Sequence, residues 1–352
     1  MNTDQQKARD LKAKSTPSIA TLPANEDRNT LLHYYYQMVM TRHFEEKSGE
    51  MYNKARIGGY CHLNLGEEAT VAGFCAALEP QDYIYTNYRE HGYALCRGIS
   101  SPSVMAELFG KETGCSKGRG GSMHLFSVEH RFMGGYGIVG GQLPLATGAA
   151  FAITYRGTNE VVACQMGDGT TNGGPFYESL NLAKIYHLPV IFFIVNNGYG
   201  MGLRTEQGSA VPELYRKARA FDMYSERVDG TDILAVRDAM RRAVKLAREQ
   251  HEPSLIEAVS YRFRGHSVVD PDRYRDREEV ERGRTQQDPI QIYAKRLSEA
   301  GLLNTQDIEE IDARAQREVD EAVHFAEESP YPSVEGLHDF VYASEDALKG
   351  EK

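Results

Sequence analysis

The residues best suited to catalysis stand in a Gly-Asp-Gly motif centred on Asp168 and in an Asn-Asn pair that ends at Asn197. Each motif directly follows an apolar run, VVACQM or PVIFFIV, that is typical of a buried strand, and the segment between them, 174–187, is typical of a helix. A right-handed strand-helix-strand crossover makes the two strands parallel neighbours, so both motifs emerge at one carboxyl edge of a sheet. Asp168 and Asn197 are therefore expected to face one another.

These motifs supply the ligands of a hard cation. A carboxylate, an amide oxygen and a backbone carbonyl suit Mg²⁺ held together with phosphate groups, rather than zinc or copper. The glycines that flank Asp168 let the backbone approach a phosphate, and the helix that begins near Gly174 would add backbone N–H donors for an anion. The sequence thus predicts a site for magnesium and a phosphate group.

A second glycine motif, from Gly135 to Gly140, competes with this interpretation. It matches the GxGxxG fingerprint of dinucleotide-binding folds, and Glu160 lies 20 residues beyond its last glycine. That fingerprint requires a buried strand before it, whereas the preceding segment SVEHRFM is polar. The chain also contains no GxxxxGK[ST] phosphate loop. Both observations argue against a nucleotide site. A nucleotide-binding oxidoreductase is kept only as an alternative from a different class, together with a non-catalytic scaffold that binds magnesium and a diphosphate.

Three further places carry groups that bind anions or move protons. They are His62, the pair Tyr88 and Arg89, and His266 within a Gly-His-Ser sequence. A guanidinium fork suits a phosphate, and an imidazole changes charge near neutral pH. Taken singly, each is more typical of an ordinary structural residue than of a catalyst.

The elements that would position these residues alternate along the chain. Helices are expected at 29–55, 66–78, 142–155, 174–187 and 233–250, and strands at 82–88, 161–166, 189–195, 225–230 and 254–261. Strands separated by helices indicate an α/β fold with a doubly wound, mostly parallel sheet and extra N- and C-terminal helices. The glycine-rich segment 110–148 is expected to be an extended connection, and the charged segment 262–284 a mobile loop.

Composition limits the class of protein. The 352 residues are 41% hydrophobic and 26% charged, which is typical of a folded globular chain. A net charge of −10 argues against binding to nucleic acid or to a membrane surface. The five cysteines contain no CxxC pair, and the chain has no apolar run of membrane-spanning length and no signal-peptide pattern, so a cytoplasmic protein is expected.

Residues 1–26 are expected to form a mobile arm, and 27–352 a single α/β domain with a C-terminal helical extension.

Taken together, the motifs resemble the α subunits of the thiamine-diphosphate-dependent decarboxylase component of 2-oxo acid dehydrogenase complexes. The resemblance covers about Leu31 to Ile290, and its most specific part is GDGTTNGG followed by VNNGYGMG. TNYREHG, KGRGGSMHL, GGYGIVGGQLPL and YRFRGHSVVDPDRYR are also similar to this family. The resemblance implies the thiamine-diphosphate-binding fold, with thiamine diphosphate and Mg²⁺ as cofactors.

The resemblance also implies roles for individual residues. It makes three groups magnesium ligands, which are Asp168, Asn197 and the carbonyl of Tyr199. It implies contacts to the diphosphate from Tyr88, Arg89, Gly169, Thr170 and His266. The backbone at Gly137 and Val139 would meet the aminopyrimidine ring, which explains the GxGxxG match. His62 and His266 would be the catalytic histidines, with His62 near the reacting carbon. Thr170 is a departure, because relatives often have alanine at this position.

The implied reaction is the oxidative decarboxylation of a 2-oxo acid, after which the acyl unit passes to a lipoyl group of the acyltransferase core. The pyruvate-specific members are the most similar, and enzymes for acetoin or for branched-chain 2-oxo acids are the alternatives.

In this family a glutamate from a separate β subunit activates the cofactor, so an assembly of two α and two β subunits is expected. Ser267 stands where some relatives are phosphorylated, but it is more typical of an ordinary loop hydroxyl.

Overall fold

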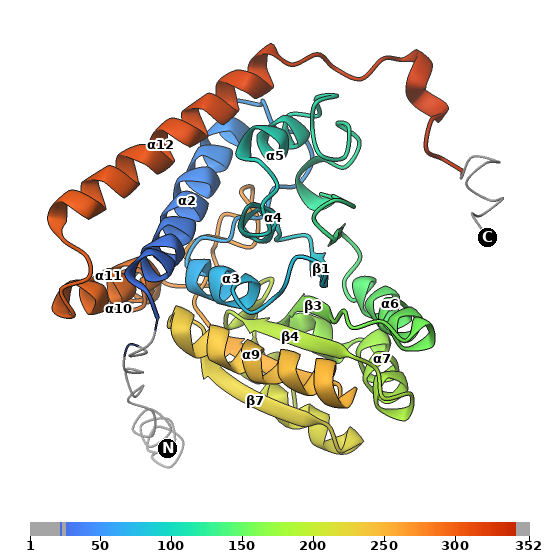
Figure 1. Ribbon diagram of the computed structural model, residues 1–352. Coiled ribbons are helices and arrows are strands. Elements are labelled where there is room, and N and C mark those ends of the chain that lie inside the picture. Colours follow the sequence, from blue (N-terminus) through green and yellow to red (C-terminus); the bar gives the residue numbers. More distant parts are fainter. Residues whose placement is uncertain (1–21, 23–25, 343–352) are drawn as a thin grey trace.

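The computed structural model describes residue 22 and residues 26–342, and its centre is a sheet of six parallel strands (Figure 1). The strands are β1 (Tyr83–Asn87), β2 (Phe132–Tyr136), β3 (Val162–Gly167), β4 (Val190–Asn196), β7 (Tyr224–Asp229) and β8 (Ser254–Val259). They lie in the order β2-β1-β3-β4-β8-β7, and every neighbouring pair is parallel. The predicted doubly wound α/β fold is confirmed.

Helices surround the sheet. They are α2 (Arg28–Asn53), α3 (Glu68–Cys75), α4 (His91–Cys96), α5 (Ser101–Leu108), α6 (Gln142–Arg156), α7 (Gly174–Ile185), α8 (Thr205–Gly208), α9 (Ile233–Gln250), α10 (Arg277–Gln286), α11 (Pro289–Glu299) and α12 (Thr305–Glu328). The 3-10 segments are η1 (Gly121–Met123), η2 (Asp168–Asn172), η3 (Leu214–Phe221) and η4 (Glu335–His338), and a short antiparallel pair is formed by β5 (Tyr199–Gly200) and β6 (Leu203–Arg204).

The central strands are apolar because both of their faces are covered. All seven residues of β4 are buried, as expected for a strand inside a parallel sheet. On one face, Leu143 of α6 and Phe176 of α7 pack with Phe192 of β4. On the other face, Phe74 of α3 joins Phe193 and residues of α9. The result is a sandwich in which helices cover both faces of the sheet.

The register of the central strands places the two predicted motifs together. Gly167 at the end of β3 pairs with Val195 of β4. Parallel strands end at the same edge, so the residues that follow each of them leave the sheet beside one another. Asp168 and Asn197 are thus delivered to one edge by β3 and β4.

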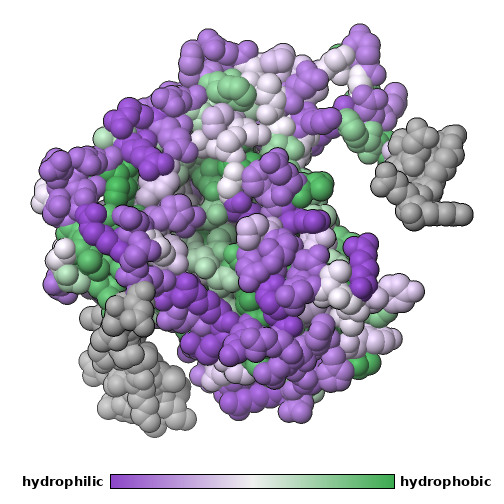
Figure 2. All heavy atoms as spheres, viewed as in Figure 1, coloured by the Kyte–Doolittle hydropathy of each residue, from purple (hydrophilic) through white to green (hydrophobic). Residues whose placement is uncertain are grey.

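A layer of long helices lies beyond α3 and α9. The Asp27 side chain caps α2 by accepting hydrogen bonds from the backbone N–H groups of Asn29 and Thr30. A capping box between Asn304 and Asp307 begins α12, which lies along α2 (Figure 1). Hydrophilic side chains cover the outward surfaces of α9 and α12 in Figure 2, as expected for amphipathic helices at a protein surface.

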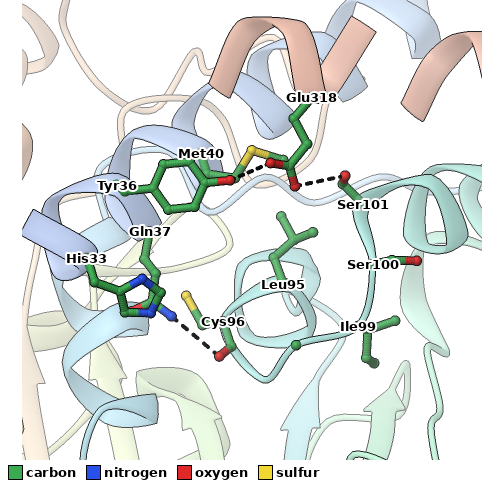
Figure 3. Close-up of a pocket in the computed structure, with 11 residues that line it drawn as sticks. His33, Tyr36, Gln37, Met40, Leu95, Cys96, Ile99, Ser100, Ser101 and Glu318 are labelled. Carbon is green, nitrogen blue, oxygen red and sulfur yellow. Dashed lines mark hydrogen bonds between the residues drawn. The ribbon is translucent and has the colours of Figure 1, made fainter. Parts of the chain in front are cut away.

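A cavity of about 190 Å³ lies between α2, α4 and α12 (Figure 3). The hydroxyls of Tyr36 and Ser101 both donate to the carboxylate of Glu318 across it. Burial, followed by the contact with Glu318, raises the pKa of Tyr36 to about 12. The cavity is lined by none of the predicted site residues, so it belongs to the packing of α12 rather than to the strand-end site.

Two of the segments in which the structure differs from the expected elements carry predicted site residues. The glycine-rich segment 110–148 contains the edge strand β2, which was not predicted because the sequence FMGGY has two glycines and little alternation. The charged segment 262–284 is not a loop throughout, since α10 begins at Arg277. The expected mobile arm, 1–26, lies outside the described residues except for residues 22 and 26. Within the described part of the chain, no helix has the length and apolar character needed to cross a membrane.

Candidate active site

The predicted site residues gather just beyond the carboxyl ends of five neighbouring strands. In sheet order these positions are Gly137 after β2, Tyr88 and Arg89 after β1, Asp168 after β3, Asn197 after β4, and His266 after β8. A parallel α/β sheet binds ligands at this edge. The fold therefore brings to one edge residues that lie up to 178 positions apart in the sequence.

Two of the three predicted magnesium ligands contact a buried cation, the guanidinium of Arg262. Nη1 of Arg262 is 3.2 Å from the carbonyl oxygen of Tyr199 and 3.4 Å from Oδ1 of Asn197. These two oxygens therefore converge on one positive group. Oδ2 of Asp168 accepts a hydrogen bond of 2.8 Å from the hydroxyl of Thr205. Burial raises the pKa of the Asp168 carboxyl above its usual value, and the Thr205 hydrogen bond opposes this rise.

Local backbone geometry explains how the second motif reaches the first. Gly198 has a φ of +87°, a left-handed conformation that favours glycine, and it turns the chain from β4 into the β5–β6 pair. Gly200 then lies against Gly169, because a Cβ built on Gly200 would be 3.4 Å from the Gly169 Cα and 3.9 Å from Oδ2 of Asp168. The two loops pack backbone against backbone around the Asp168 carboxylate.

Two of the residues predicted to contact the diphosphate follow Asp168 directly in the chain. Gly169 and Thr170 lie in η2, and α7 starts at Gly174 and runs for 12 residues. Thr171 donates a hydrogen bond of 2.8 Å from its hydroxyl to the Asp168 carbonyl, which holds the turn closed. The positive end of the α7 dipole thus faces the same edge as Asp168, a favourable arrangement for an anion.

Two histidines and a tyrosine form an aromatic cluster beside this edge. The His62 ring centroid is 4.3 Å from that of Tyr88 and 5.0 Å from that of His266. Nδ1 of His62 and Nδ1 of His266 are buried and have no hydrogen-bond partner in the described part of the chain. Buried ring nitrogens without partners are unusual in a folded protein. They fit a site that is completed by a bound group.

The same burial fixes the charge of both histidines. Burial, and then the charge of Arg89, lower the pKa of His62 to about 2. The same two causes, in the same order, lower the pKa of His266 to about 4. Both rings are therefore neutral near pH 7. The sequence-based expectation of an imidazole that titrates near working pH does not hold for this arrangement, because both rings are buried and lie near the positive charge of Arg89.

Arg89 has a structural task that the sequence did not indicate. Its Nη1 donates to the carbonyl of Leu63 at 2.7 Å, and its Nη2 donates to the carbonyl of His266 at 2.8 Å. Arg89 therefore joins the segment that carries His62 to the segment that carries His266. Its direct contact with a diphosphate stays a prediction.

The opposite end of the site is open. The side chains of Ile138 and Val139 are 79% and 57% exposed, next to Gly137. Glu90 packs behind Gly135 and is fully buried, and its carboxyl accepts hydrogen bonds from Leu125 N at 2.8 Å and from the Thr86 hydroxyl at 2.9 Å. This acid is directed into the protein interior.

Three residues that contact the predicted ligands were not found from the sequence. Glu67 accepts a hydrogen bond from Asn197, Thr205 donates one to Asp168, and Arg262 donates to Asn197 and Tyr199. Each comes from a segment distant from its partner in the sequence. Only Arg262 had a signal, since it lies in the YRFRGHS segment that was singled out for His266.

The donor set fits a magnesium ion bound with a diphosphate. The predicted ligands are a carboxylate, an amide oxygen and a carbonyl, all of them hard oxygen ligands, and the last two converge on Arg262. The unpartnered imidazole nitrogens and the N-terminus of α7 provide for the anion that would accompany the metal. The fold and the site therefore define a parallel α/β protein with a candidate cofactor site at the carboxyl edge of its sheet.

Comparison with known proteins gives the family. Residues 36–335 match the family model described as the dehydrogenase E1 component, and the chain belongs to this family. A pyruvate dehydrogenase E1 component subunit alpha from Porphyra purpurea is 42% identical over 326 residues, which are 91% of this chain and 94% of the relative. A protein of the same name from Zymomonas mobilis is 44% identical over 313 residues, 89% of this chain and 88% of the relative. The family depends on thiamine diphosphate.

Proposed function

We propose that this chain is the α subunit of a pyruvate dehydrogenase, which decarboxylates pyruvate oxidatively and transfers the acetyl unit to a lipoyl group of an acyltransferase core. The observation that carries the proposal is the convergence of the Asn197 and Tyr199 oxygens at the sheet edge beside Asp168. The proposal is also supported by membership of the family and by relatives that are named as α subunits of pyruvate dehydrogenase. Acetoin and branched-chain 2-oxo acids are the alternative substrates.

Each group of residues has a separate task in this proposal. Asp168, Asn197 and the Tyr199 carbonyl would hold Mg²⁺, and Gly169, Thr170 and the α7 N-terminus would hold the diphosphate. Tyr88, Arg89 and His266 would close the site over the phosphate groups. Thiamine diphosphate supplies the carbanion chemistry of the decarboxylation when it is bound.

The histidine cluster would orient the substrate rather than carry charge. A neutral His62 has one ring N–H to donate and one nitrogen to accept, so it can bind a carboxylate or a carbonyl oxygen beside the cofactor. The ring contacts with Tyr88 and His266 hold its plane in place. The packed cluster also keeps water away from the reacting group.

A β subunit would complete the site. The exposed Ile138 and Val139 mark the end where the aminopyrimidine ring would lie. The nearby Glu90 is buried and hydrogen-bonded within the protein interior. We infer that the activating carboxylate comes from the β subunit, in an assembly of two α and two β subunits. The lipoyl-bearing core would be the acceptor of the acetyl unit.

The test is reconstitution with an artificial electron acceptor. Pyruvate-dependent reduction should occur only when both subunits and Mg²⁺ with thiamine diphosphate are present, and pyruvate should be preferred over branched-chain 2-oxo acids. Asp168→Ala should abolish it, while the variant keeps its far-UV circular dichroism, because Asp168 lies at the sheet edge. Full turnover by the α chain alone would refute the need for a β subunit. A preference for acetoin or for branched-chain acids would reassign the substrate.

A cytoplasmic location is proposed for the assembly. All five cysteines are free, which fits a reducing compartment. Relatives include chloroplastic as well as bacterial proteins. Fractionation of cells that produce the tagged chain tests the location, and recovery in an organelle or membrane fraction would contradict it.

A further inference from the structure

A buried carboxylate lies behind one of the proposed metal ligands. Glu67 is only 1% exposed, directly before α3. Its Oε1 accepts a hydrogen bond of 2.7 Å from Nδ2 of Asn197, and its Oε2 accepts one of 3.1 Å from Nδ2 of Asn64. No role for Glu67 follows from the motifs, because it lies 130 positions from Asn197 in the sequence.

The Glu67 contact decides which way the Asn197 amide faces. Nδ2 is the donor atom of the Asn197 amide, and it faces Oε1 of Glu67, which accepts the hydrogen bond. Oδ1 is then directed to the other side, where it accepts from the backbone N–H of Tyr199 and from Arg262 Nη1, both at 3.4 Å. Turning the amide over would place Oδ1 against the carboxylate and present two N–H groups to the cation site.

Glu67 is itself held in place. The partner amide of Asn64 cannot turn over freely, because its Oδ1 accepts a hydrogen bond of 3.3 Å from the backbone N–H of Gly92. The backbone N–H of Asn64 donates at 2.9 Å to Oε1 of Glu45, another fully buried carboxylate. The orientation of Asn197 is therefore set by a chain of buried polar groups that begins in α2.

We propose that Glu67 is the positioning residue of the magnesium site, which fixes the Asn197 side chain with its oxygen toward the metal. This inference rests on the proposed function. Partners that hold a metal ligand typically change metal affinity by about 10- to 100-fold when they are removed. Glu67 acts through Asn197, and so its loss should weaken the metal and leave the metal-independent contacts of the cofactor in place.

The chain offers a matched control. Asn196, the preceding asparagine, donates from its Nδ2 to Oε1 of Glu257 at the same distance, 2.7 Å, and Glu257 is also fully buried. However, Oδ1 of Asn196 accepts from the backbone N–H of Gly198, so it is not one of the converging oxygens. Glu257→Gln thus removes an equivalent buried carboxylate from an asparagine that is not a proposed ligand.

The experiment is calorimetric titration of the metal-stripped α/β assembly with Mg²⁺ at a fixed concentration of thiamine diphosphate. The samples are wild type, Glu67→Leu, Glu67→Gln and Glu257→Gln. Thermal stabilisation by thiamine diphosphate in EDTA is measured on the same samples and reports contacts that need no metal. Light scattering confirms that each variant is assembled.

Glu67→Leu should lower the affinity for Mg²⁺ by about 10- to 100-fold. Glu67→Gln should lower it less, because one oxygen still accepts from Asn197. Stabilisation in EDTA should stay unchanged in all samples, and Glu257→Gln should bind Mg²⁺ like wild type. If Glu67→Leu fails to assemble, the Mg²⁺ affinity of Glu67→Gln is compared with that of Glu257→Gln instead.

Two results would overturn the inference. One is wild-type Mg²⁺ affinity in the assembled Glu67 variants, and the other is an equal loss in Glu67→Gln and Glu257→Gln. Failure of the proposed function would look different, since wild type itself would then show no binding of thiamine diphosphate that depends on Mg²⁺.

Discussion

At the scale of single residues, burial decides the chemistry of the site as much as residue type does. His62 and His266 have ordinary pKa values near 6.5 in an unfolded chain, but in the cluster the values fall to about 2 and about 4. The main cause is burial, and the second is the charge of Arg89. A site built this way would bind anions through neutral donors next to a fixed cation, and its histidines keep the same charge over the whole range near neutral pH.

The first prediction concerns the pH dependence of stability at His62. Below about pH 6.5 the unfolded chain takes up a proton at this position, whereas the folded chain does not until about pH 2. Folded wild type therefore loses up to about 1.4 kcal/mol per pH unit on acidification from this group. His62→Asn removes the effect, so the Tm of the variant minus the Tm of wild type should increase from pH 7.5 to pH 5.5.

The measurement is thermal unfolding of the assembled protein at several pH values, in buffers of equal ionic strength. Other titrating groups are common to both proteins and cancel in the difference. His43→Asn is a suitable control, because His43 pairs with Asp312 through an exposed contact of 2.7 Å and is not buried in the cluster. A Tm difference for His62→Asn that does not change with pH would contradict the assignment.

At the scale of elements, the sequence was informative where local signals and packing agree. The apolar run of β4 predicts a strand, and the helical spacing of apolar residues in α9 predicts a helix. The motifs that follow the strands could be placed because parallel strands end at the same edge of the sheet. The strand β2 could not be found, because two glycines in FMGGY remove the alternation that marks a strand. The start of α10 did have a signal, namely Asp276 as a capping residue followed by two acidic residues in the first turn.

Partners from distant segments could not be predicted in the same way. Nothing near Asn197 in the sequence indicates that Glu67 orients it, or that Thr205 holds Asp168. These contacts exist only after the sheet has placed the loops beside one another. The sequence could therefore indicate candidate ligands, and the structure was needed to find which residues contact them.

The second prediction belongs to the segment between β8 and α10. Its chain is tied by Arg275, which donates to the carbonyls of Arg262 and Arg264 at 2.6 and 2.7 Å, while Arg264 and Arg273 are exposed. Trypsin should cut after these exposed arginines more slowly when Mg²⁺ and thiamine diphosphate are present, because His266 then gains a phosphate partner that holds the segment. The rate is followed by mass spectrometry of the fragments. Asp168→Ala should show no protection, and equal rates in wild type with and without cofactor would count against ordering by the ligand.

At the scale of the whole molecule, the exposed end of the site continues into an apolar helix face. Leu145, Phe151 and Tyr155 of α6 are 49%, 47% and 86% exposed, and the helix starts directly after the exposed Val139. The ring of Phe151 also contacts Tyr186 beyond α7, with centroids 5.5 Å apart, so the two helices share this face. A large apolar face next to an incomplete site is the surface on which the proposed β subunit would lie.

The last prediction tests this face at Gly148, which lies between Leu145 and Phe151 on the outward side of α6. A Cβ at this position would meet no atom within 4 Å, so Gly148→Arg fits the isolated chain. Arginine also favours a helix interior over glycine by up to about 1 kcal/mol, so the substitution should stabilise α6 itself. In the assembly the same side chain would place a bulky charge between two apolar surfaces, and formation of the α/β complex should fail by light scattering. Ala313→Arg, on the exposed surface of α12, should assemble normally. Because the substitution strengthens the helix that carries it, a loss of assembly cannot be attributed to misfolding of that helix, and normal assembly of Gly148→Arg would show that the β subunit docks elsewhere.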